Sequence, residues 1–228
     1  MTGSPLALPV AFHIGPIAVT TPVVVTWGIM LLLAGGGWLL TRRLGMHPSS
    51  RQAALELVVQ TIEAQIRDTM QVDPAPYLPL IGTLFLFIFV ANWSSLVPGV
   101  HPPTAHLETD SALALIVFLA VSYFGIRVQG LRGYLRTFAE PSIIMIPLNV
   151  VETLTRTFSL VVRLFGNVMS GVFVIGIVLS LVGLLVPVPL MALDLLTGAV
   201  QAYIFSVLAM VFIAGGLGNR TQQKPEGR

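Results

Sequence analysis

The chain has 228 residues, of which 55% are hydrophobic and only 10% are charged, and its mean hydropathy is +0.88. Soluble domains carry about 25% charged residues, so this composition excludes an ordinary soluble protein and predicts an integral membrane protein. Because the chain has no cysteine, disulfides and thiolate metal sites are excluded. The formal net charge of +2 says little, since the placement of basic residues matters more in a membrane protein than their sum.

The first half of the chain predicts two membrane spans with an amphipathic helix between them. Residues 1–22 hold no Lys or Arg, and we expect an apolar outer tail there rather than a cleaved leader. The first span is expected at residues 23–41. In residues 49–70, apolar residues recur at helical spacing among charged ones, which is typical of an amphipathic helix on the membrane surface or against a partner. The second span is expected at residues 79–97.

The second half predicts three further membrane segments. The third span is expected at residues 112–126, followed by a basic connector at residues 127–136. Residues 141–185 are almost continuously apolar and exceed twice the length of one perpendicular span of about 20 residues. They form either one long tilted helix or a short embedded piece followed by a span. A turn with two prolines, residues 186–189, leads to the last span at residues 190–217.

The basic residues outside the apolar segments all lie on one side of this layout. They follow the first span, occur in the amphipathic helix and the basic connector, and end the chain in the polar tail, residues 218–228. The positive-inside rule then predicts five crossings, with the N-terminus outside and the C-terminus in the cytoplasm. The predicted fold is one all-α membrane domain whose two long C-terminal helices form a hairpin. No internal repeat supports an inverted-repeat transporter.

An arginine, Arg163, lies in the middle of the fourth apolar segment. A charge near the bilayer centre costs at least about 2.5 kcal/mol on insertion scales, so an intramembrane arginine indicates an ion pathway or a binding site. Helical spacing places it in a polar stripe that comprises Glu152, Arg156, Ser159, Arg163, Asn167 and Ser170.

The last predicted helix carries a shorter stripe: Asp194, Thr197 and Gln201. Two stripes on consecutive helices can face each other with water or ions between them. The alternative is that these residues have only structural roles. Arg163 would then form an ion pair with Asp194, and Arg156 would extend to the cytoplasmic interface. The small polar groups would stabilise helix packing. We favour a pathway, because too many costly polar groups converge for packing alone.

Two short sequence motifs indicate which kind of ion pathway this is. Residues 159–171 read SLVVRLFGNVMSG and resemble the hallmark of subunit a of the F-type ATP synthase membrane sector. Residues 201–205 read QAYIF and resemble the second hallmark of that family, and weaker similarity covers nearly the whole chain. The resemblance implies that Arg163 faces a rotating ring of c subunits. The family's asparagine and glutamine then fall on Asn167 and Gln201.

The same resemblance implies a mechanism and partners. Each c subunit carries a membrane carboxylate, and Arg163 would favour its ionised form, forcing release of a proton or a sodium ion and preventing leakage between two aqueous half-channels. An arginine suits this role because it stays protonated. The implied partners are the c ring, the b subunits of the peripheral stalk, membrane lipid and, indirectly, the F1 sector. The implied location is the bacterial plasma membrane, with no cofactor, no metal, no nucleic acid and no catalytic site in this chain.

Three positions depart from the pattern of many relatives. Val172 stands where they have an acid, Asp194 where they often have a histidine, and Thr157 where they have a proline. We expect the carboxylate to have moved to Asp194, next to position 172 across the helix pair, where it would serve the outer half-channel. Glu152 receives no role from the family. The remaining members of the two stripes, Arg156, Ser159 and Thr197, are expected with Glu152 to line a half-channel. These departures favour a divergent branch such as the N-type ATPases.

The sequence allows two alternative functions. A stand-alone secondary transporter or channel could use the same stripes, but it would purify alone, whereas a rotary subunit would come with c and b subunits. A membrane-embedded hydrolase is disfavoured because the four histidines lack metal-ligand spacing: His13, His47, His101 and His106. The chain also has no P-loop motif for a nucleotide.

Overall fold

The protein is almost entirely helical in the parts that the computed structural model describes, which are residues 10–14, 17–42, 50–97, 100–139, 145–182 and 187–217. Within these parts, five helices are long and apolar enough to cross a membrane. The predicted all-α integral membrane fold is therefore confirmed. One feature was missed: strands β1 (Val10–Ile14) and β2 (Ile17–Thr20) pair in an antiparallel hairpin, in a region expected to be only a tail.

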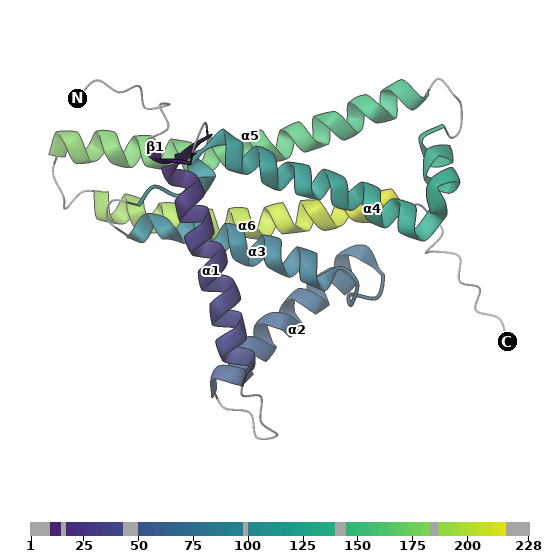
Figure 1. Ribbon diagram of the computed structural model, residues 1–228, viewed down its shortest axis with the longest axis horizontal. Coiled ribbons are helices and arrows are strands. Elements are labelled where there is room, and N and C mark those ends of the chain that lie inside the picture. Colours follow the sequence, from purple (N-terminus) through teal and green to yellow (C-terminus); the bar gives the residue numbers. More distant parts are fainter. Residues whose placement is uncertain are drawn as a thin grey trace.

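The first three helices begin close to where the sequence predicts them. Helix α1 is Thr21–Thr41, α2 is Ser50–Met70, and α3 is Leu78–Trp93, continued by a short 3-10 turn, η1, at Ser94–Leu96. A proline lies in the first turn of both α1 and α3, where its missing N–H leaves no hydrogen bond unmade. Figure 1 shows α1 crossing the other long helices steeply, with α2 returning from its far end toward α3.

Helix α4, Leu107–Ala139, is much longer than the third span expected at residues 112–126. It follows a second 3-10 turn, η2, at Pro103–Ala105, and it starts five residues earlier than predicted. Residues 127–136, predicted as a basic connector, are helical, but a sharp bend with non-helical backbone divides α4 into two segments within them. The bend is at Gly130, whose φ of 74° and ψ of 162° favour a residue without a Cβ.

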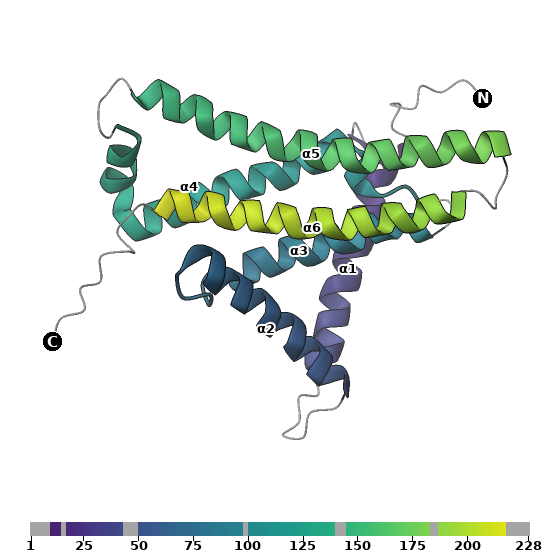
Figure 2. The same ribbon diagram turned by 180° about the vertical axis from the view of Figure 1, so that it is seen from behind.

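The fourth apolar region forms one continuous helix, α5, Met145–Val182. Its 38 residues give a length of roughly 57 Å, about twice the 30 Å hydrocarbon core of a bilayer, so this helix must be strongly tilted if it stays in the membrane. Helix α6, Pro187–Leu217, begins at a proline that was expected in the turn. Figure 2 shows the C-terminal part of α5 beside the N-terminal part of α6; toward the other end the two helices diverge and α4 lies between them, and α3 is next to α6. The predicted basic tail, residues 218–228, lies outside the described residues.

The two long helices are buried to different extents. Helix α6 contacts α2, α3, α4 and α5, and its buried side chains include Phe205, Met210 and Ile213. Helix α5 contacts α4, α6 and η2, and it buries one narrow face, formed by Leu160, Val161, Leu164 and Val168. The rest of α5 is left available to the membrane or to another protein.

Candidate functional site

The polar stripe of α5 lies outside its buried face. Five of its members are exposed and Asn167 is half-buried; the exposed ones are Glu152, Arg156, Ser159, Arg163 and Ser170. The helical period explains this arrangement, because Leu160, Leu164 and Val168 turn toward the neighbouring helices and the stripe lies beside them. The sequence prediction that these polar groups share one side of a helix is confirmed.

Arg163 lies within the polar stripe on the uncovered surface of α5, and large apolar side chains occupy the rest of that surface. Phe158 is 67% exposed and Val162 is 48% exposed. Within the described residues, the ion pair formed on α5 joins Arg156 to Glu152, and Arg163 forms none with Asp194. Arg163 therefore presents its charge outward, on a surface otherwise suited to the membrane interior.

Asp194 lies directly against α5 at Gly171. A Cβ added to Gly171 would overlap the Asp194 carboxylate, so a larger residue at this position would force that side chain to move. The Asp194 carboxylate therefore lies against the residue that precedes Val172. Thr197 does not bind this carboxylate, because its hydroxyl donates a hydrogen bond of 3.0 Å to the Asp194 carbonyl.

Gln201 is buried in α6, with 6% of its surface exposed. Its side-chain nitrogen has no hydrogen-bond partner among the described residues. Helices α5 and α6 are antiparallel, with Gly171 near Asp194 and Arg156 over the ring of Phe212 at 5.5 Å. Midway between these contacts, Gln201 is level with the part of α5 that holds Arg163. The two predicted stripes thus belong to one helix pair.

A buried hydrogen-bond network joins α3 to α6 close to Asp194. Asn92 donates from Nδ2 to the Gly198 carbonyl at 2.8 Å, and it accepts from the hydroxyl of Thr104, in η2, at 2.6 Å. The sequence by itself assigns no role to Asn92 or to Thr104. A buried asparagine in a membrane helix was a usable signal, since such a group needs partners. The partners lie 12 and 106 residues away, so the sequence could not name them.

Next to this network lie Asp110 and His106, which fall between the second and third spans predicted from the sequence. Asp110 is instead in the first turn of α4 and is completely buried. Burial lowers the pKa of His106, an effect that Glu108 opposes and His101 reinforces. The signal for Asp110 was its helical spacing to Leu113, Ala114 and Val117, all of which are buried.

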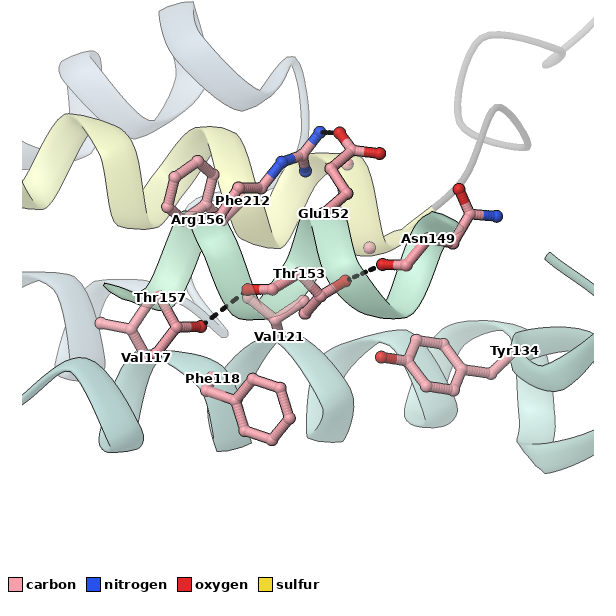
Figure 3. Close-up of a pocket in the computed structure, with 12 residues that line it drawn as sticks. Val117, Phe118, Val121, Tyr134, Asn149, Glu152, Thr153, Arg156, Thr157 and Phe212 are labelled. Atoms are coloured by element: carbon pink, nitrogen blue, oxygen red, sulfur yellow. Dashed lines mark hydrogen bonds and ion pairs between the residues drawn. The ribbon is translucent and has the colours of Figure 1, made fainter. Parts of the chain in front are cut away.

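A cavity of about 240 Å³ lies near the other end of α5, between α4, α5 and α6. Figure 3 shows Glu152 and Arg156 on its wall with Thr153, Asn149 and Tyr134. Glu152 and Arg156 are paired with each other, one helical turn apart. The cavity gathers two predicted half-channel residues, whereas Ser159 and Thr197 do not line it.

Comparison with known proteins decides the family. The model of the family described as "ATP synthase A chain" matches residues 23–214. The chain belongs to this family. A relative from Bradyrhizobium sp., named ATP synthase subunit a 2, is 57% identical over 96% of this chain and 98% of its own length. A second from Pelobacter propionicus, also named ATP synthase subunit a 2, is 50% identical, over 90% of each chain.

A third relative, named ATP synthase subunit a, from Albidiferax ferrireducens, is 49% identical over 93% of this chain and 92% of its own length. The resemblance to F-type subunit a is thus confirmed. As an ATP synthase A chain with five long apolar helices, the protein is a multi-pass membrane subunit that takes part in ion transport and ATP synthesis.

Proposed function

We propose that this chain is the ion-translocating stator subunit of a rotary F-type ATP synthase, with Arg163 facing the c ring. The observation that carries the proposal is the outward position of Arg163 on the apolar, uncovered surface of α5. A cation on such a surface is costly unless the facing partner supplies an anion. A ring of c subunits, each with one membrane carboxylate, is a partner of that chemistry.

Two polar regions on either side of Arg163 support two half-channels. Along α5, Glu152 is roughly 16 Å from Arg163 in one direction, and Gly171 is roughly 12 Å away in the other. The cavity near Glu152 would open to the cytoplasm, and the region of Asp194 would open to the outside. These sides follow the distribution of basic residues, which also gives an outer N-terminus and a cytoplasmic C-terminus in the bacterial plasma membrane.

The proposed cycle uses the electrostatics of a buried carboxylate. A neutral c-ring carboxylic acid can face lipid, but the ionised form is too costly there. As the acid approaches Arg163, the positive charge favours ionisation, and the proton leaves by the exit half-channel. Direct flow between the half-channels is blocked by the same charge. Ions therefore cross only by travelling with the ring, which rotates against this chain and the b stalk and drives the F1 sector.

The decisive experiment compares Arg163→Ala with Arg132→Ala in the complete complex, reconstituted in lipid vesicles. Arg132 is an exposed arginine on α4, beyond the bend, and serves as the control. ATP-driven acidification, followed with a fluorescent dye, should be lost in Arg163→Ala and retained in the control. Coupled transport at the wild-type rate in Arg163→Ala would overturn the proposal. A chain that purified without c subunits and still transported ions would favour a stand-alone transporter.

A further inference from the structure

Asp110 is a buried acid that the proposed mechanism does not yet use. It has 0% of its surface exposed, and both carboxylate oxygens lack a hydrogen-bond partner among the described residues. Its neighbour Glu108, in the same helical turn, is exposed to solvent as acids at helix starts usually are. A helix start therefore does not by itself explain why Asp110 is buried.

The contacts of α4 define where this acid lies. Asp110 begins the face of α4 that is buried against α5 and α6. Farther along that face, Val121 touches α6 at Gly216, where an added Cβ would lie 2.9 Å from its Cγ1. From this contact, a step of eleven residues toward the N-terminus covers roughly 16 Å on each helix. It leads to Asp110 on α4 and to Phe205 on α6. Asp110 is therefore about level with Gln201, one helical turn from Phe205.

The surroundings of Asp110 are polar on the side of Asp194. Thr104, six residues earlier, is bonded through Asn92 to Gly198 of α6. Gln201 contributes a second buried polar atom without a partner, its side-chain nitrogen. Two unpartnered polar groups at one level of two contacting helices are unusual, since buried polar groups are normally hydrogen-bonded. Each exception calls for a physical explanation.

We propose that Asp110 is a proton relay group at about the level of Arg163, on the path that begins at Asp194. An ionised carboxylate without any partner would be very costly at this depth, so the group carries its proton between transfers. In each passage it gives this proton to one acceptor and takes another from a donor, so the carboxyl group is regenerated and no co-reactant is needed. The relay rests on the proposed function, and it adds a second acid to the path that begins at Asp194.

The test is proton translocation by the complete, reconstituted complex carrying Asp110→Asn, with Glu108→Gln as the matched control. Asparagine keeps the size and polarity of the side chain but cannot relay the proton, so the rate should fall by about 100-fold. Asp110→Glu, which restores the acid, should recover part of the rate, which a purely structural role does not predict. Subunit composition after purification checks that each variant assembles.

If Asp110→Asn does not assemble, Asp110→Thr provides a second non-acidic variant, and it should also be inactive in transport. Wild-type translocation by either assembled non-acidic variant would overturn the relay, as would a requirement for sodium ions in transport. Arg163→Ala is measured in parallel. If it is inactive while Asp110→Asn is fully active, only the relay fails. If both variants pump normally, the proposed function fails as well.

Discussion

Near Gly171, polar side chains are packed tightly between helices, whereas near Glu152 they line an open cavity. At the Gly171 end, the Asp194 carboxylate touches α5, and each polar side-chain atom of Asn92 forms a hydrogen bond. At the Glu152 end, the cavity measures about 240 Å³, and the Glu152–Arg156 pair is about half exposed.

This difference distinguishes two environments for polar and charged groups in a membrane protein: close packing between helices and the wall of an open cavity. A close-packed polar group depends on the shape of its surroundings, because a displacement of one ångström can change its function strongly. A group at an open cavity keeps contact with solvent and tolerates change, and an exposed ion pair contributes little to stability. The two ends should therefore respond differently to equally conservative substitutions.

The largest effect is expected for Asp194→Asn. Removing the acid at the packed end should lower ATP-driven proton translocation by about 100-fold, the usual contribution of one positioned acid or base. Dye-monitored acidification of vesicles measures this rate. Asp73→Asn, at an exposed acid between α2 and α3, is the control. Wild-type pumping by Asp194→Asn would show that the packed end carries no essential carboxylate.

A methyl group at Gly171 should have the next largest effect. Alanine in a helix interior is normally about 1 kcal/mol more stable than glycine, but here the added Cβ meets the Asp194 carboxylate. We expect Gly171→Ala to lower translocation by about 10-fold, with loss of stability through overpacking. Gly176→Ala on the same helix has open space for its Cβ and should be slightly stabilised. Equal unfolding temperatures for the two variants would contradict the close packing.

The smallest effect is expected for Glu152→Gln at the open end. The variant breaks the ion pair with Arg156, but both side chains are about half exposed, so the stability should change by less than about 1 kcal/mol. Translocation should change only a few-fold, as in Glu63→Gln, a control on α2. Complete loss of pumping would mean that Glu152 itself carries the proton and that the two ends are alike.

The sequence predicts a helix accurately where hydropathy or helical spacing gives a strong local signal. Hydropathy and helical spacing located α1, α2, α3 and α6 to within a few residues, because length and apolarity alone decide whether a segment can span a bilayer. The same reasoning ended the third span at the basic residues and missed that α4 continues past them. Gly130 reads as a break in the sequence, and in the structure its non-helical backbone divides α4 into two helical segments that meet at a kink.

By itself, the sequence determined the membrane class, the polar stripe with Arg163 and the family, since these follow from composition, periodicity and short strings. Tertiary structure alone decided that Arg163 faces outward, that Asp194 meets Gly171, and that Asp110 is buried. Each of these depends on which face of one helix meets another, and a helix can rotate its faces without any change in its own hydrogen bonds. Only packing between distant segments sets that rotation.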